Sequence, residues 1–228
     1  KFNSNLNAFA VYYQTGLSIA QDNNVEANFY YRILTTIERK IRKLKSLGET
    51  VPDVGKTSLK ELMLNPPIVF YDRLNEIKTS FNESQLWRNK KLILIIDEFT
   101  YIFYQIKKGA ISQTFMQNWK AFIEDSGFSL VVSGQDTMKQ FTQEFPNEFG
   151  MFKPERLTYL DDVSAKELID EPVWDNANSR SRYTRDSIDK IISLTACSPF
   201  YIQIICNELV RFMNSKKKPV LTPRDVED

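Results

Sequence analysis

An acidic pair, Asp97 and Glu98, directly follows the apolar run Leu92-Ile-Leu-Ile-Ile96. The run predicts a buried strand, and in an open α/β sheet the last side chains of a strand face the ligand crevice. An aspartate there can hold Mg²⁺ through water, and the next glutamate can orient and polarise a water for attack on a phosphoryl group. We therefore take Asp97 as a candidate metal-binding residue and Glu98 as a candidate catalytic residue. The alternative is a polar loop that simply follows a core strand.

A second polar group follows a second predicted strand, residues 128–133. By the same geometry, Ser133 or Gln135 would face the crevice and contact a γ-phosphate or the attacking water. We take Gln135 as a candidate catalytic residue and Ser133 as a candidate nucleotide-binding residue. The alternative is a turn from strand to helix, in which Gly134 supplies backbone freedom and a helix N-cap follows it.

The stretch Gly55-Lys56-Thr57 has the sequence that ends a P-loop. A P-loop also needs an earlier glycine, where this chain has Thr50, and a buried strand directly before it that aims its N–H groups at the phosphates. The residues before Gly55 are typical of a loop instead. We interpret the stretch as a turn with a cap, Thr57 or Ser58, for a short helix over residues 59–64. A compact NTPase that uses Gly55-Lys56-Thr57 remains the alternative, and it requires a strand before residue 55.

Composition narrows the chemistry further. The chain has 228 residues, no histidine, and 30 basic against 29 acidic residues, for a net charge of +1. The absence of histidine excludes catalytic triads and metal sites that need this residue, and leaves chemistry run by carboxylates, Lys, Arg and metal-bound phosphate. The balanced charge does not indicate nucleic-acid binding, and no apolar run is long enough to span a membrane. We expect a cytoplasmic protein, in which Cys197 and Cys206 are reduced thiols rather than a disulfide.

The order of elements predicts an α/β fold. Apolar runs occur at residues 8–13, 92–96 and 128–133, and helical periods occur at 26–47, 68–78 and 112–125. Strands that alternate with helices indicate a mostly parallel sheet flanked by helices, with the strand before Asp97 at its centre and buried on both faces. We expect this α/β core to span residues 1–159.

Residues 160–228 are expected to form a small all-helical domain. Helical periods occur at 184–195 and 199–214. Three helix starts are predicted: a capping box from Ser164 to Glu167, Ser198-Pro199, and Thr222-Pro223. Arg156, just before this domain, could reach a phosphate as an arginine finger, but a surface role is the simpler interpretation.

Several stretches, in their order along the chain, resemble the STAND branch of the AAA+ P-loop ATPases, which is related to the origin-recognition ATPases. These stretches are 92–99 (Walker B), 128–135 (the sensor 1 strand), 156–160 with the helix that ends at 168–172, and 194–203. The resemblance implies a P-loop NTPase-like sheet, a helical lid, and ATP with Mg²⁺ between them. It implies that Asp97 serves the metal, Glu98 the water, Gln135 the γ-phosphate and Pro199 the adenine.

The chain also departs from the family. The family's Walker A lies before the strand that residues 8–13 resemble, so we expect a piece of a longer protein that begins after its P-loop, or one that lacks it. Ala196 and Cys197 replace the glycines that commonly precede Pro199. The leading hypothesis is the ATP-hydrolysing core of a molecular switch, with ATPase activity in the intact protein and ATP or ADP as ligand. The alternative is a non-enzymatic interaction module on a degenerate P-loop fold, which would self-associate or bind a protein partner.

Overall fold

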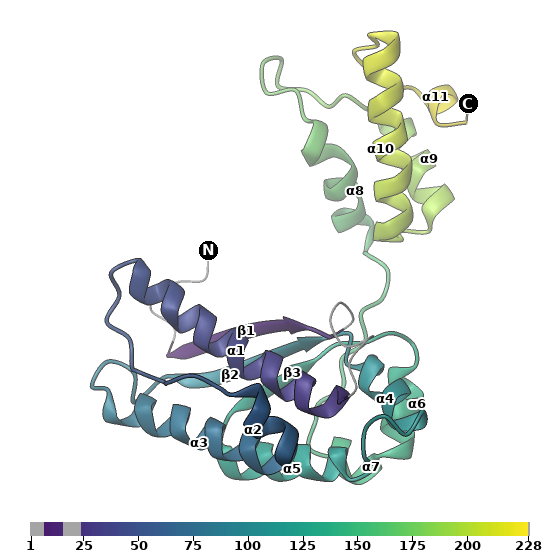
Figure 1. Ribbon diagram of the computed structural model, residues 1–228. Coiled ribbons are helices and arrows are strands. Elements are labelled where there is room, and N and C mark those ends of the chain that lie inside the picture. Colours follow the sequence, from purple (N-terminus) through teal and green to yellow (C-terminus); the bar gives the residue numbers. More distant parts are fainter. Residues whose placement is uncertain (1–6, 16–23, 228) are drawn as a thin grey trace. The chain divides into compact units, whose positions relative to one another are not determined.

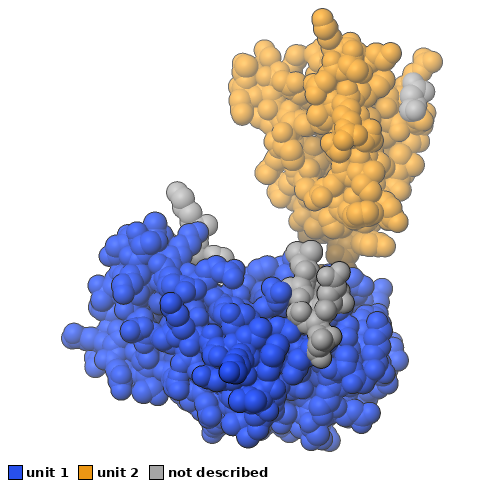
Figure 2. All heavy atoms as spheres, viewed as in Figure 1, with its two compact units in different colours: residues 1–152 blue, residues 153–228 orange. Residues whose placement is uncertain are grey.

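The computed structural model describes residues 7–15 and 24–227, and the chain divides into two compact units. Unit 1 spans residues 1–152 and unit 2 spans residues 153–228 (Figure 2). Each unit buries a hydrophobic core of its own. Each therefore meets the basic requirement for a domain.

Unit 1 is built on a three-stranded parallel sheet in the order β1-β2-β3 (Figure 1). The strands are β1 (Ala8–Gln14), β2 (Lys91–Asp97) and β3 (Ser129–Val132). The register pairs Gln14 with Asp97, and Leu130 with Leu94. The predicted α/β fold with parallel strands is therefore confirmed, and β2 is the central strand.

Helices connect the strands and follow the last of them. They are α1 (Val25–Ser46), α2 (Leu59–Leu64), α3 (Pro66–Glu83), α4 (Thr100–Lys107), α5 (Phe115–Ser126), α6 (Met138–Glu144) and α7 (Pro146–Phe149). The longest, α1, begins at Asn24, whose side-chain oxygen accepts a hydrogen bond from the N–H of Ala27 at 3.0 Å. This bond satisfies one of the N–H groups that a helix start leaves without a partner. Within the described part of the chain, every helix is too short or too polar to span a lipid bilayer.

An aromatic cluster forms the centre of the unit 1 core. Tyr30 of α1 stacks on Phe70 of α3, with ring centroids 4.4 Å apart. Trp119 of α5 lies against both rings and is 1% exposed. Phe29 contacts Trp119 and also Tyr13 of β1, so the cluster extends from the helices to the sheet. Aromatic pairs of this kind each contribute roughly 0.5–1.5 kcal/mol beyond the area they bury.

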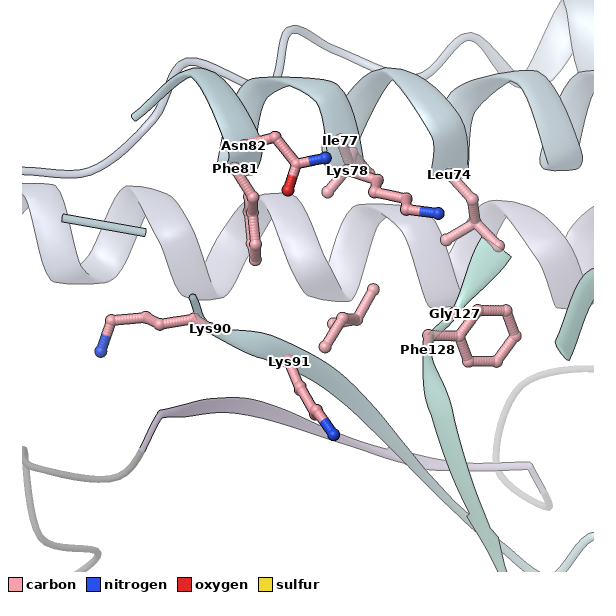
Figure 3. Close-up of a pocket in the computed structure, with 10 residues that line it drawn as sticks. Leu74, Ile77, Lys78, Phe81, Asn82, Lys90, Lys91, Gly127 and Phe128 are labelled. Atoms are coloured by element: carbon pink, nitrogen blue, oxygen red, sulfur yellow. The ribbon is translucent and has the colours of Figure 1, made fainter. Parts of the chain in front are cut away.

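The two faces of the sheet differ in burial. On the covered face, Val11 and Leu94 are each 1% exposed and belong to the core. On the opposite face, Tyr12 is 55% exposed, Val131 is 51% exposed, and Ile95 between them is partly exposed. Figure 3 shows α3 on one side of the strands. The prediction that β2 is buried on both faces is therefore wrong, because the helices of unit 1 pack against one face.

Unit 2 is helical and has a separate small core. Its helices are α8 (Asp162–Asp170), the 3₁₀ helix η1 (Glu171–Val173), α9 (Arg185–Thr195), α10 (Pro199–Lys216) and α11 (Pro223–Glu227). Two isolated bridges, Asp175 with Arg180 and Tyr183 with Leu221, are its β-type pairings among the described residues. Cys197 and Cys206 are free thiols, as predicted.

The start of α8 differs from the prediction. The cap is Asp161, whose Oδ1 accepts a hydrogen bond from the N–H of Ser164 at 2.7 Å. Ser164, which the sequence favoured as the cap, lies inside the helix. Aspartate caps a helix as well as serine does, and its charge also interacts favourably with the helix dipole.

The one-sided sheet predicts different effects for two identical substitutions. Val11→Thr places a hydroxyl in the core and should lower the free energy of unfolding by about 1–3 kcal/mol. Val131→Thr changes an exposed position and should lower it by less than about 0.5 kcal/mol. Urea unfolding followed by the fluorescence of the buried Trp87 and Trp119 measures both. Equal losses would contradict the one-sided burial.

Candidate functional site

Four of the predicted site residues lie at one edge of the sheet. The strands are parallel, so their carboxyl ends meet at the same edge, where Gln14 of β1 pairs with Asp97 of β2. Ser133 directly follows β3, and its hydroxyl donates to the carboxylate of Asp97. Glu98 and Gln135 continue from the ends of β2 and β3 and are hydrogen-bonded to each other. We call Asp97, Glu98, Ser133 and Gln135 the strand-end site.

Three hydrogen bonds from described residues orient the carboxylate of Asp97. Its Oδ1 accepts from the hydroxyl of Ser133 and from the N–H of Glu98, the latter at 2.9 Å. Its Oδ2 accepts from the hydroxyl of Tyr12, which comes from the neighbouring strand β1, at 2.8 Å. A carboxylate oxygen has two acceptor positions, and among the described residues Oδ2 has a partner at one of them. The side chain is thus fixed in direction and still able to accept one more partner.

The same bonds keep Asp97 ionised. The hydroxyl of Ser133 lowers the pKa of Asp97 most, and the hydroxyl of Tyr12 lowers it further. The hydrogen bond to Asp97 in turn raises the pKa of Tyr12. Both shifts have the same cause, since a hydrogen bond that a carboxylate accepts stabilises its charged form. At neutral pH the strand-end site therefore presents an oriented negative charge.

Thr15 fixes the position of the backbone carbonyl of Asp97. Its N–H and its hydroxyl both donate to the carbonyl oxygen of Asp97, at 3.0 and 2.7 Å. Thr15 is completely buried. The backbone carbonyl of Asp97 is therefore held from the β1 side, and the carboxylate of the same residue is held from the side of both neighbouring strands.

Glu98 adopts a backbone conformation that is rare for its residue type. Its φ is 58°, in the left-handed region that costs roughly 1–2 kcal/mol for a residue with a side chain. The turn is kept by the N–H of Phe99, which donates to the carbonyl of Ser133 at 2.8 Å. In this position the Oε2 of Glu98 accepts from the amide of Gln135 at 3.3 Å. Conformations of this kind cluster at functional sites, where the surroundings hold them in place.

Gly134 is required for a reason other than backbone freedom. Its φ is not in the left-handed region. A Cβ on Gly134 would lie 2.7 Å from the Cγ2 of Thr100 and 2.7 Å from the Cγ of Met138. The prediction of special backbone freedom is therefore wrong, and close packing between the ends of β3, α4 and α6 explains the glycine.

Two residues of the site were not predicted. The sequence indicates a strand at residues 8–13, but a period of two does not show which neighbour each residue will meet. The register of β1 with β2 places Tyr12 beside Asp97 and brings Thr15 to its carbonyl. A tyrosine two residues before the end of a strand was the available signal.

Pro199 lies in unit 2, where it is the first residue of α10. Ser198 is the N-cap, as predicted, although its side chain makes no capping hydrogen bond. The next two residues, Phe200 and Tyr201, are 66% and 56% exposed. The contact between Pro199 and an adenine stays a prediction.

The segment around Gly55-Lys56-Thr57 is a loop that binds to the helices of unit 1. The N–H and hydroxyl of Thr57 both donate to the Oε1 of Glu38, a buried residue of α1. Arg73 of α3 lies 3.6 Å from the same Oε1 and also donates to the carbonyl of Val54 at 2.7 Å. Helix α1 and a loop precede Gly55 in the chain, so the strand that a P-loop requires is not directly before it. Ser58, as predicted, caps α2.

The donor set at Asp97 fits a Mg²⁺ ion that is bound mostly through water and phosphate. Among the described residues, no group of three or more His, Cys, Asp or Glu side chains is placed to hold a metal ion. Mg²⁺ does not need such a group, because it usually keeps several waters and binds one or two carboxylates together with substrate phosphates. The acceptor position on Oδ2 of Asp97 that no described residue fills suits one such water.

Comparisons with known proteins identify no relative. No model of a known protein family matches the chain, and neither a curated protein nor a solved structure matches it. The functional argument therefore rests on the residues of the strand-end site and on the resemblance of their sequence motifs.

The loop around Thr57 predicts unequal roles for the two acidic partners of Arg73. Glu38→Ala removes the acceptor for Thr57 and leaves Arg73 without its buried partner, so it should lower the free energy of unfolding by about 3 kcal/mol. Glu76→Ala removes an exposed partner of the same arginine and should cost less than about 1 kcal/mol. Urea unfolding of both variants measures the difference. A near-neutral Glu38→Ala would show that the loop is not anchored there.

The hydroxyl of Ser133 predicts a pH effect. In Ser133→Ala the pKa of Asp97 should rise toward its ordinary value of 3.8, as followed by NMR titration of the carboxyl carbon. Because the pKa is lowered in the folded protein, the bond stabilises the fold above the unfolded pKa, and this is lost as the pH falls through the folded value. The stability gap between parent and variant should thus be full at pH 7 and close in acid. Ser129→Ala, in the strand that Ser133 follows, is the control, and an equal rise in the pKa of Asp97 in that variant would refute the assignment.

Proposed function

We propose that the strand-end site is the part of an ATP-hydrolysing site that binds Mg²⁺ and orients the attacking water. The observation that carries this is the carboxylate of Asp97, which Ser133, Tyr12 and a backbone N–H orient, while no described residue fills the second acceptor position of its Oδ2. A polar loop after a core strand needs no such arrangement. Oriented carboxylates at strand ends of α/β sheets are typical of phosphoryl-transfer sites.

Each residue of the site has a distinct role under this proposal. Asp97 would hold a water of the Mg²⁺ shell, and Mg²⁺ bound with ATP neutralises charge on the phosphates. Glu98 would accept a hydrogen bond from the attacking water and orient it. Gln135 donates to Glu98, and it would direct that carboxylate or contact the γ-phosphate. Ser133 would act through Asp97, whose carboxylate it fixes.

The part of the ATP-hydrolysing site that binds phosphate would join the sheet at the edge of β3. Ser133 donates its N–H to β2, so the alternation of the strand turns the backbone groups of Leu130 and Val132 away from β2. No strand among the described residues pairs with that side. A further parallel strand there would end next to Ser133, and a helix after it could cover Ile95 and Val131. The resemblance, for its part, places a Walker A segment before the strand predicted at residues 8–13.

Under the same proposal, unit 2 is the helical lid of the ATPase and Pro199 contacts the adenine. The support is the resemblance at residues 194–203 together with the helix start at Ser198 and Pro199. Exchange or hydrolysis of the nucleotide would then change the lid, as in other nucleotide switches.

The second candidate is a non-enzymatic interaction module on the same fold. One observation favours it: the Gly55-Lys56-Thr57 stretch follows a helix and a loop rather than a strand, and its Thr57 is bound to Glu38. Such a module would bind a protein partner or a second copy of itself. The third hypothesis, a compact NTPase built on Lys56, lacks the strand it requires.

Glu98→Gln tests the catalytic assignment. In a protein that hydrolyses ATP, the amide cannot accept the proton of the attacking water, so the rate should fall by about 100-fold or more. Calorimetry should find the affinity for ATP with Mg²⁺ within about threefold of the parent, because Glu98 does not hold the nucleotide. Asp136→Asn, the same change at an exposed position of the neighbouring loop, is the control.

The experiment is run on the 228-residue chain and on a version extended by any residues that its gene encodes before Lys1. Hydrolysis by Glu98→Gln at the parent rate would exclude the proposed role. If neither protein binds ATP, the interaction module is the better description. Binding by the 228-residue chain that Lys56→Ala abolishes would favour the compact NTPase.

A further inference from the structure

Basic side chains gather at the end of unit 1 where the strands begin. They come from the last turns of α1 and from the segment between α3 and β2, which lie on the same side of the unit (Figure 1). Residues 42–49 and 83–91 hold two acidic residues, Glu49 and Glu83. They also hold six basic residues, which we call the basic end: Arg42, Lys43, Lys45, Arg88, Lys90 and Lys91. The whole chain has a net charge of +1, so its positive charge is concentrated here.

Trp87 holds the two segments of the basic end together. Its indole Nε1 donates to the carbonyl oxygen of Thr50, in the loop after α1, at 2.9 Å. Its ring packs against Phe9 of β1 and Phe81 of α3, and Trp87 is only 3% exposed. The ammonium group of Lys90 lies over the same ring, 5.5 Å from its centroid. The basic end is therefore one surface of fixed shape rather than two independent loops.

The cations of the basic end have no acidic partners. None of the six forms an ion pair within the described part of the chain. Five of them are exposed, and Lys90 is half-buried. Cations near the C-terminus of a helix interact favourably with its dipole, which accounts for Lys43 and Lys45. Arg88 and Lys91 lie outside the helices, so the dipole does not account for them, and a cluster of like charges attracts an anionic partner.

Two leucines among these cations are also exposed. Leu47 is 67% exposed and Leu86 is 65% exposed. Leu47 is the C-cap of α1, and Leu86 lies in the turn two residues before Arg88. A single exposed leucine is common on protein surfaces. Two of them at turns, flanked by unpaired cations, match a bilayer surface, which takes up apolar side chains at the headgroup level and attracts Lys and Arg by its charge. The phosphates of a nucleic acid would pair with the cations but offer no apolar surface to the leucines.

We propose that the basic end docks unit 1 on a membrane surface that contains anionic lipid. Leu47 and Leu86 insert at the level of the headgroups, and the six cations lie against the lipid phosphates and carboxylates. A contact of this kind needs no helix that spans the bilayer. The strand-end site lies at the opposite edge of the sheet, where Gln14 pairs with Asp97. The inference is therefore independent of the ATPase proposal, and either can fail without the other.

Vesicle binding tests the role of charge. The 228-residue chain is mixed with phosphatidylcholine vesicles that contain either no anionic lipid or about 30% phosphatidylserine, and the bound fraction is measured by co-sedimentation. We expect binding to the anionic vesicles alone, and weaker binding as salt is added, because salt screens the attraction. Lys43→Gln combined with Lys45→Gln should lower the partition coefficient about 25-fold, since each basic residue near the surface contributes about fivefold. The matched control is Lys108→Gln combined with Lys139→Gln, which changes two exposed lysines beyond the ends of β2 and β3. It should lower the coefficient by less than about twofold.

The two leucines distinguish a membrane from other polyanions. Leu47→Ser combined with Leu86→Ser keeps every charge and should lower the partition coefficient about tenfold, because less apolar surface leaves water. The affinity of this variant for a single-stranded DNA oligonucleotide, measured by fluorescence anisotropy, should equal that of the parent. Circular dichroism and tryptophan fluorescence establish that each variant is folded.

Four results would overturn the proposal. Three concern charge: no co-sedimentation with anionic vesicles at low salt, equal binding to the neutral vesicles, and a loss in the Lys43 and Lys45 variant no larger than in its control. The fourth is an unchanged partition coefficient in a folded Leu47 and Leu86 variant. Tight binding of the oligonucleotide together with that fourth result would identify a nucleic-acid surface instead. If the leucine variant does not fold, the lysine variant and its control decide.

Discussion

The register of the three strands is the constraint on which the site depends, and burial of one face of the sheet sets that register. Side chains alternate along a strand, so a shift of one residue would move Val11 and Leu94 from the aromatic core into solvent. The same shift would turn Tyr12 away from Asp97. A cluster of buried rings between α1, α3 and α5 thus determines, at a distance, which polar groups meet at the edge of the sheet.

The hydrogen bonds at that edge then stabilise a conformation that the local sequence does not prefer. The left-handed backbone of Glu98 is unfavourable by about 1–2 kcal/mol. It is held because the N–H of Glu98 donates to Asp97 and the N–H of Phe99 donates to Ser133. These bonds link the ends of β2 and β3, and Thr15 links the end of β2 to β1. Orientation of Asp97 and strain at Glu98 are therefore two consequences of one network.

Local patterns in the sequence were enough to find most elements of this fold. Apolar runs located the strands, and helical periods located α1, α3, α5, α9 and α10, because these patterns depend on neighbours along the chain. Helix α4 was missed, since its 8 residues offer little more than two turns of periodicity. The cap of α8 was placed three residues late because Asp161 and Ser164 are both good caps.

The predicted site shows the same limit. That Asp97, Glu98, Ser133 and Gln135 meet at one edge could be predicted, because strand ends are readable from the sequence and parallel strands end at one edge. Tyr12 was not found, because its role depends on the register between segments 85 residues apart. The one-sided burial of β2 was not found either, since an apolar run does not show which of its faces a helix will cover.

The two outer edges of the sheet differ in whether a side chain bonds their outward backbone groups, and this difference bears on the site. On β1 the ammonium group of Lys40 donates to the outward carbonyl of Ala10, and burial lowers the pKa of this lysine. A lysine in that position blocks the addition of a further strand.

On β3 the outward groups of Leu130 and Val132 have no such partner among the described residues. Any strand that joins the sheet would therefore join at β3. Its end would lie next to Ser133, whose hydroxyl orients Asp97. The unpaired edge of β3 thus ends beside the residue that holds Oδ1 of Asp97, so a strand that completes the sheet there would also reach the site.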